Sequence, residues 1–324
     1  MDVPRIGRLM LRGLVIYLGM IVLALPLRAA PLDRRQLPAE VVWFFHLDAE
    51  AAHTTILGKG MRDAILAQPQ AQRAIERVKE TIGIDPIRDL SGITAYGVDF
   101  APDESVLIVR GNVDRPRLLD LLAKAPGYRA ETLEGHDIYT WSEPDNERTS
   151  SGAFFGQDTI VISRDIHAVV KALEVLEEKG PSLAADSPLL ASATVEPGVF
   201  VQAGAVGLAD ARNVPIHSPI LRQCESGSIT VGEQSGEVFV DAKVNARSAE
   251  TASKMRLMIE GAKAMAQLQA GDESDLGRLL APVSVTSVDR SVEIRWRYPS
   301  ADLVKYVQAQ AITFAPRPQP VTQP

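Results

Sequence analysis

Alternating and clustered hydrophobic positions predict the same order of elements twice along the chain. The first series comprises a strand at 41–48, a helical region at 49–82, strands at 93–100 and 105–110, a helix at 116–124 and a hairpin at 128–141. The second comprises a strand at 198–204, an irregular stretch to 219, strands at 228–233 and 237–245, a helix at 248–269 and a hairpin at 283–297. This order predicts an internal repeat.

Local signals agree with these boundaries. Gly83 follows the last apolar position of the first helical region, and glycine readily ends a helix in the left-handed conformation. Asp114 can cap the helix that follows it, and Pro116 suits the first turn, where its missing N–H has no partner. In the last hairpin, Val292 and Ile294 alternate with charged residues, which is typical of a half-buried strand.

Strands that come in hairpins, with helices between the pairs, predict antiparallel sheets covered by helices. We therefore expect an α+β fold of two related two-layer domains, each a mainly antiparallel sheet covered by helices. The expected parts are a first domain at 38–180, a linker rich in Ser, Ala and Pro at 181–197, a second domain at 198–312 and a disordered Pro-rich tail at 313–324.

The first series also carries segments that we interpret as an appendage. Two strand-like runs lie at 152–156 and 159–163, and a helix with apolar residues at helical spacing follows at 165–179. The second series ends instead with a single helix at 301–310.

Residues 13–27 form an apolar run that three arginines precede and that Ala29 and Ala30 follow. This order of basic, apolar and small residues is that of a secretory signal peptide. The run is shorter than the roughly 20 residues of a membrane span and contains Pro26. We expect residues 1–29 to be a signal peptide and the remaining protein to be periplasmic or extracellular; an uncleaved segment would tether it to a membrane.

The segment Gly83–Gly97 reads GIDPIRDLSGITAYG, a turn between a helix and a strand. This phrase, together with the strand that ends at Asp48, resembles uncharacterised exported bacterial proteins of a domain-of-unknown-function type. The resemblance covers about residues 38–180 and implies a signal peptide followed by α+β domains. It implies no catalytic residues.

Net charge and cysteine usage narrow the classes of function. The chain has 34 basic and 41 acidic residues; without residues 1–29 it would have 30 and 40. Because nucleic acids and anionic lipids require a basic surface, this balance argues against both as partners. Cys224 is the only cysteine, so the chain forms no internal disulfide, and we expect a small buried hydrophobe there rather than a nucleophile.

One cluster of residues has the chemistry of metal ligands. His46, Asp48, Glu50 and His53 lie where the first strand passes into the first helix, and a divalent ion such as zinc uses such side chains. The alternative is structural, with Asp48 capping the helix and Glu50 near its positive end. The sequence lacks the spacing of zinc-protease, phosphate-loop and nucleophile-elbow motifs, and we expect no cofactor.

Apolar residues offer a second kind of site. Met255, Met258 and Met265 recur along the helix at 248–269, where we expect them in the core, although this Ala-rich helix could also pack against a partner protein. Trp43, Phe44 and Phe45 are consecutive in a strand, so either both faces of the sheet are covered or one aromatic residue is exposed.

These observations predict a non-enzymatic binding or scaffolding module of the cell envelope. Its partner would be an envelope protein or a small ligand in a cleft between the two domains. The alternative is a cell-envelope hydrolase or metal-dependent enzyme that uses His46, Asp48 and His53 or an unrecognised pair of carboxylates.

Overall fold

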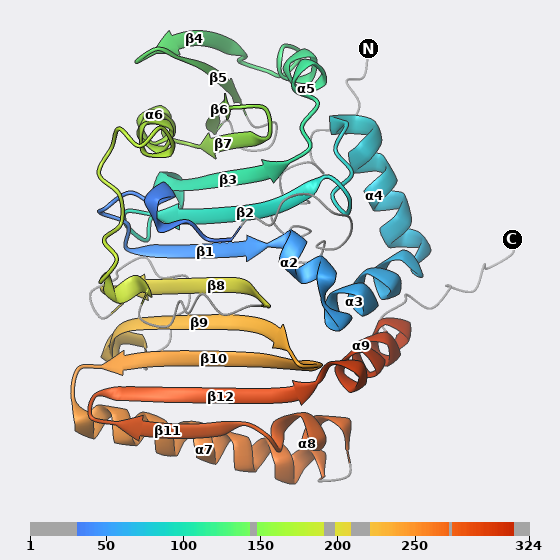
Figure 1. Cartoon of the computed structure of the whole chain (residues 1–324), viewed down its shortest axis with the longest axis vertical. Helices are drawn as coiled ribbons and strands as arrows, with labels where there is room; N and C mark the ends of the chain where they lie inside the picture. The colour runs from blue at the N-terminus through green and yellow to red at the C-terminus, as the bar shows by residue number, and fades with distance from the viewer. Residues whose placement is uncertain (1–30, 143–147, 191–197, 209–220, 272–273, 314–324) are drawn as a thin grey trace, which may run out of the picture.

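The computed structural model describes residues 31–142, 148–190, 198–208, 221–271 and 274–313 (Figure 1). The strands are β1 (Trp43–Asp48), β2 (Leu90–Gly97), β3 (Ser105–Gly111), β4 (Arg129–Leu133), β5 (His136–Ser142), β6 (Thr149–Phe155), β7 (Thr159–Ser163), β8 (Val199–Val206), β9 (Cys224–Gln234), β10 (Glu237–Ala246), β11 (Ser284–Val288) and β12 (Ser291–Pro299). The structure thus confirms the predicted strands of both series.

The α-helices are α2 (Ala49–Thr54), α3 (Ile56–Leu66), α4 (Pro69–Ile82), α5 (Arg115–Leu122), α6 (Ile166–Leu176), α7 (Ala249–Ala270), α8 (Asp275–Leu280) and α9 (Ser300–Thr313). Short 3-10 helices lie at Arg34–Gln36, Pro102–Glu104, Pro188–Leu190 and Leu221–Gln223. Gly83 ends α4 at a φ of 75°, and the Asp114 carboxylate accepts a hydrogen bond from the N–H of Arg117 at 3.1 Å, as predicted. The sequence did not predict α8.

One antiparallel sheet contains strands from both halves of the chain. Its order is β11-β12-β10-β9-β8-β1-β2-β3-β7-β6-β5-β4 (Figure 1). The two halves meet where β1 pairs with β8, with Phe45 opposite Ala203. The expectation of a separate sheet for each half is therefore wrong, because the first strands of the two series pair with each other. The structure is α+β, with helices packed on a mainly antiparallel sheet, as predicted.

The topology also corrects our interpretation of the appendage. β7 pairs with β3, and β12 pairs with β10, so the hairpins β6–β7 and β11–β12 occupy matching places on the two sides of the sheet. A helix follows each of them, α6 in the first half and α9 in the second. The additional hairpin is β4–β5, which pairs with the outer side of β6.

Helices α6 and α7 cover opposite faces of the sheet. Phe44 faces α6 and belongs to the largest buried cluster, which includes Leu173. Val244 packs in a different cluster, with Met255 of α7. Across β9 and β8, Val244 lies in the same row of the sheet as Trp43. Neighbouring residues of a strand point to opposite faces, so Phe44 points away from the side of Val244. Helices α6 and α7 therefore lie on opposite sides of the sheet.

The described part of the predicted linker belongs to the core. Leu183 and Leu189 are buried among residues of the first half, and the N–H of Leu183 donates to the carbonyl of Leu37 at 2.8 Å. Residues 191–197 of this linker, the irregular stretch at 209–220, the predicted signal peptide and residues 314–324 of the tail lie outside the described residues.

Two further contacts connect the halves beside the central strand pair. Helices α3 and α9 pack closely, because Gly60 of α3 leaves room for Val304 of α9. The carboxylate of Glu233, on β9, accepts hydrogen bonds from the N–H groups of Ile56 and Leu57 at 2.7 and 2.8 Å. These N–H groups open α3 and have no partner within the helix, so an acidic side chain stabilises them.

Replacement of Glu233 by alanine should lower the free energy of unfolding by about 1–3 kcal/mol, since two charge-assisted hydrogen bonds are lost at the start of α3. Urea unfolding of the variant and of Glu237→Ala measures this effect. Glu237 is exposed on β10 and serves as the matched control, which should stay within about 0.5 kcal/mol of the parent protein. Equal effects of the two substitutions would contradict a capping role for Glu233.

Candidate functional site

The residues of the predicted metal-ligand cluster make contacts within the fold. Asp48 caps α2, since its carboxylate accepts a hydrogen bond from the N–H of Ala51 at 2.8 Å, which confirms the structural alternative. His46 is buried on β1, with Nδ1 2.9 Å from the hydroxyl oxygen of Thr94. His53 lies on α2 and is also buried.

These side chains do not converge on a shared point. Among the described residues, no three His, Cys, Asp or Glu side chains are close enough together to hold a metal ion. Burial, followed by the charge of Arg62, lowers the pKa of His53 to about 4, which favours a neutral imidazole. Burial and the neighbouring Asp48 raise the pKa of Glu50. The residues of this cluster therefore form no set of metal ligands in the described structure. The burial of His53 makes the stability of the protein depend on pH.

Cys224 is buried on β9, where burial raises the pKa of its thiol. A thiol in this environment stays protonated at neutral pH and is a poor nucleophile. The structure thus places Cys224 in the core of the second half, as expected from the sequence.

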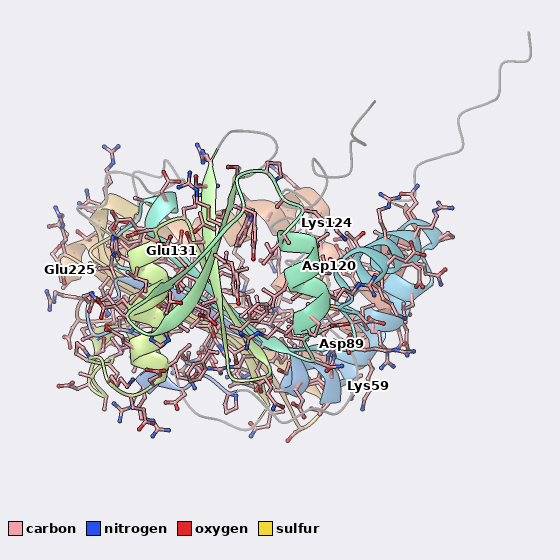
Figure 2. All side chains as sticks on the ribbon, turned by 90° about the horizontal axis from the view of Figure 1, so that it is seen from above. Lys59, Asp89, Asp120, Lys124, Glu131 and Glu225 are labelled. Atoms are coloured by element: carbon pink, nitrogen blue, oxygen red, sulfur yellow. The ribbon has the colours of Figure 1, made fainter. Side chains whose placement is uncertain are left out.

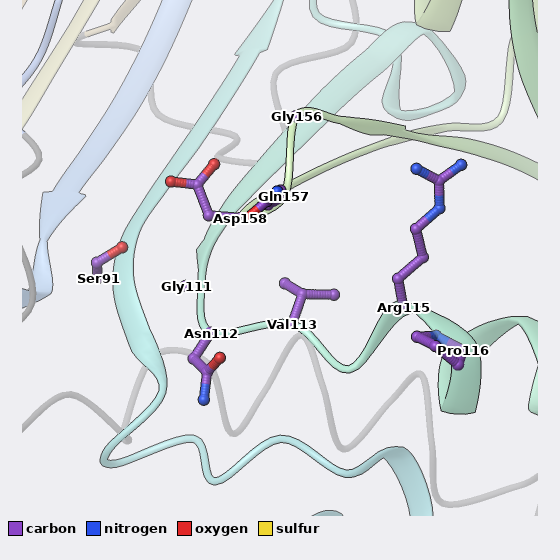
Figure 3. Close-up of a pocket in the computed structure, with 9 residues that line it drawn as sticks. All are labelled: Ser91, Gly111, Asn112, Val113, Arg115, Pro116, Gly156, Gln157 and Asp158. Atoms are coloured by element: carbon purple, nitrogen blue, oxygen red, sulfur yellow. The ribbon is translucent and has the colours of Figure 1, made fainter.

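A hollow of about 520 Å³ lies beside the start of α5 (Figure 3). Its charged lining residues are Arg115 and Asp158, and the remaining lining includes Ser91 and Asn112. The Arg115 guanidinium lies over the ring of Phe154, 4.9 Å from its centre, and the hydroxyl of Thr159 donates to Asp158 at 2.9 Å. Both charged groups are thus engaged by neighbouring residues. The hollow lies within the first half and not in the cleft that we expected between two domains.

Charged side chains are spread around the molecule and many are paired locally. The labelled residues of Figure 2 come from several parts of the fold, and Asp120 of α5 forms an ion pair of 2.6 Å with Lys124, just past the end of this helix. Glu225 lies 3.3 Å from the guanidinium of Arg290. Exposed pairs of this kind contribute little to stability and mark no binding site by themselves.

The outer side of α7 is the most exposed apolar feature of the described surface. Six residues on one face of the helix form what we call the α7 stripe: Leu257, Met258, Gly261, Ala264, Met265 and Leu268. The exposed fractions of Leu257, Met258, Met265 and Leu268 are 56, 54, 60 and 83 %. A run of exposed large apolar side chains on one helix face is typical of an interaction surface.

The inner side of α7 explains why the stripe faces outward. Ala252 and Met255 are buried against the sheet, and Ile259 packs beside them. Lys263 follows on this side and donates from Nζ to the carbonyl oxygens of Ala281 and Val283. These contacts fix the rotation of the helix about its axis, so the stripe cannot turn inward without losing them.

The expectation that the three methionines of α7 lie in the core is wrong for two of them. Met255 is in the core as expected, but Met258 and Met265 are exposed, because they lie on the opposite side of the helix. The signal in the sequence was the second apolar row at 257–268, which runs alongside the buried row. For the three aromatic residues at 43–45 we expected either that both faces of the sheet are covered or that one aromatic residue is exposed; the exposed residue is Phe45, at 38 %.

A smaller apolar patch lies on the sheet itself. Phe45 of β1 and Ile229 of β9 lie in one row across β8, and both are exposed by just over a third. The α7 stripe is longer and more exposed. None of the described helices is long and apolar enough to cross a membrane.

Comparisons with known proteins do not assign the chain to a family. No family model matches the sequence, and no curated protein matches it. Among solved structures, crystal forms III and IV of TP0453 are similar to this chain, with TM-scores of 0.46 and 0.44 and a sequence identity of 8 % in both cases. They cover 87 % of this chain, which in turn covers 100 and 97 % of theirs. A likeness of this degree assigns no function.

The protein should become less stable in acid because of His53. Its pKa is lowered to about 4 in the folded chain, from 6.5 ordinarily, so between these values the unfolded chain binds more protons. The contribution of His53 to the free energy of unfolding is complete above about pH 6.5 and decreases as the pH falls towards 4. Urea unfolding at pH 7 and 4.5 should show a loss about 2 kcal/mol larger in the parent protein than in His53→Gln.

The matched control is His167→Gln, because His167 is exposed at the start of α6. This variant should lose as much stability in acid as the parent protein. If His53→Gln also lost as much, the buried neutral imidazole would not be the source of the acid sensitivity.

Proposed function

We propose that this protein is an exported, non-enzymatic binding module and that the α7 stripe is its docking surface. The observation that carries this proposal is the exposure of four large apolar side chains along one helix, with Leu268 exposed by 83 %. Leu276 of α8, the helix that follows α7, is a further exposed apolar residue, with 46 % exposure. Because water disfavours such surface, contact with a partner would stabilise it.

The position of the helix in the fold supports this role. α7 packs against β10, β11 and β12, at the end of the sheet, where its outer side meets no other described element (Figure 1). A docking surface on a helix that a large sheet holds in place needs little ordering when a partner binds, which favours affinity.

We also infer that the two halves of the chain derive from one repeated α+β unit. The support is the matching strand order on both sides of the central pair, β1-β2-β3-β7-β6 and β8-β9-β10-β12-β11. In this interpretation the first unit gained the hairpin β4–β5, and the second unit gained the long α7 with its second apolar row.

Export rests on the sequence of residues 1–30, with its basic, apolar and small regions in the order of a signal peptide. The alternative of a hydrolase or metal-dependent enzyme has less support. The described structure does not bring His46, Asp48 and His53 together as ligands, and the charged groups of the hollow beside α5 are engaged with neighbours.

Photo-crosslinking in cells tests the proposal directly. A photoreactive amino acid replaces Leu268 in the full-length protein, and the matched control carries it at Val288, which is 65 % exposed on β11. The position 268 protein should give discrete crosslinked species that the position 288 protein does not give. Mass spectrometry of the same samples should find a first residue at 30 or 31.

Absence of crosslinks at both positions, or equal patterns at both, would contradict a docking role for the α7 stripe. A recovered chain that still contains residues 1–29 would contradict cleavage and leave the protein tethered to a membrane.

A further inference from the structure

The middle of the α7 stripe contains a glycine for which the described residues give no structural reason. Gly261 lies inside a 22-residue helix, where glycine costs about 1 kcal/mol relative to alanine. A Cβ at this position would have no heavy atom within 4 Å among the described residues, so no neighbouring element requires the small side chain. No described residue accounts for Gly261, and a partner whose backbone approaches α7 closely would account for it.

The arrangement of large and small residues indicates what that partner is. Two small residues, Gly261 and Ala264, lie at the middle of the stripe, and large residues flank them on both sides: Leu257 and Met258, Met265 and Leu268. Such a surface is complementary to a copy of itself that runs in the opposite direction. Leu257 would lie opposite Leu268 of the second copy, and Gly261 opposite Ala264.

The charges beside the stripe are compatible with this contact. Lys254 pairs with Glu250 and Arg256 pairs with Glu260, both at 2.6 Å, within α7 itself. The surface therefore brings no large charge of one sign against itself. A membrane surface would favour an excess of unpaired Lys and Arg beside the apolar residues, together with Trp or Tyr, which the stripe lacks. Antiparallel helices also align their dipoles favourably.

The size of the surface fits a small but specific interface. The stripe extends over about 16 Å of helix, and burial of its exposed apolar side chains on two copies would remove on the order of 1,000 Å² from water. This area is at the lower end for specific association. The contact is a two-fold interface in which the same surface is used by both subunits.

From these observations we propose that the partner of the α7 stripe is a second copy of this chain, bound as an antiparallel α7–α7 pair centred between Gly261 and Ala264. This proposal rests on the proposed function and names the partner of the same surface.

The first test measures the mass of the protein, purified as the cell processes it, by sedimentation at protein concentrations from low to high micromolar. The parent protein should change from monomer to dimer across the series. Gly261→Leu should raise the dissociation constant of the dimer about tenfold or more, because its side chain holds the helices apart. Measured as a monomer, the variant should melt at the same or a slightly higher temperature, since the site has space among the described residues and leucine favours a helix more than glycine does.

Leu268→Lys should also weaken the dimer, whereas Val288→Lys, at another exposed apolar position outside the stripe, should not. A parent protein that stays monomeric throughout, or a dimer that Gly261→Leu and Leu268→Lys leave unchanged, would overturn the proposal.

Engineered cysteines test the direction of the pairing. In the antiparallel arrangement two copies of residue 264 lie close to the two-fold axis, while two copies of residue 257 are about 16 Å apart along the helices. A mild oxidant should therefore link Ala264→Cys into a covalent dimer but not Leu257→Cys, and an equal mixture of Leu257→Cys and Leu268→Cys should form the mixed dimer. The native Cys224 is buried and should not interfere. Efficient crosslinking of Leu257→Cys alone would contradict the antiparallel arrangement.

Flotation with vesicles of neutral and anionic phospholipids separates this proposal from membrane binding. Vesicle binding by a monomeric protein, abolished by Leu268→Lys, would overturn the dimer but leave α7 as a docking surface. If photo-crosslinking joined position 268 to a different protein while the purified chain stayed monomeric, the proposed function would stand and the second copy would be wrong. If the purified chain stayed monomeric and photo-crosslinking at position 268 gave no discrete species, both proposals would be wrong.

Discussion

The antiparallel pairing of β1 with β8 is the interaction on which the rest of this structure depends. These strands begin the two halves of the chain and lie at the centre of the sheet, so each is hydrogen-bonded on both sides. Gly204 of β8 shows how tightly the region is packed, since a Cβ there would lie 2.5 Å from the carbonyl oxygen of Leu189 and 2.9 Å from the ring of Phe44. The joined sheet gives both halves a common core that neither could complete alone.

The two halves use this sheet differently. In the first half α6 buries a broad apolar face, and most large side chains there are inside. In the second half the face opposite α7 carries charged side chains, among them an ion pair of 2.7 Å between Arg297 and Asp241. The other face is covered by α7 and also by α2, α3 and α9, and part of the 22-residue α7 stays exposed. The α7 stripe is the apolar part of the helix that stays exposed, and it supports a function in binding.

The sequence predicted the elements well because their signals are local. Gly83 and Asp114 mark helix ends by backbone chemistry that needs no distant partner. The joining of β1 and β8 could not be predicted in the same way, since the paired strands lie about 160 residues apart and alternation does not specify a partner. The exposure of Met258 and Met265 was missed for a related reason. Two apolar rows on one helix cannot be assigned to core and surface until the contacts of Met255 fix its rotation.

Native-state hydrogen exchange of the full chain tests the central claim most directly, namely that one sheet joins both halves and holds α7 rigidly at its end. The account predicts that the slowest amides include those of β1, β8, β10 and β12, and that they exchange with a common free energy, because opening any of them requires global unfolding. Much faster exchange throughout β8–β12 than in β1–β3 would contradict it. The two halves would then be independent units, and α7 would belong to the less stable one.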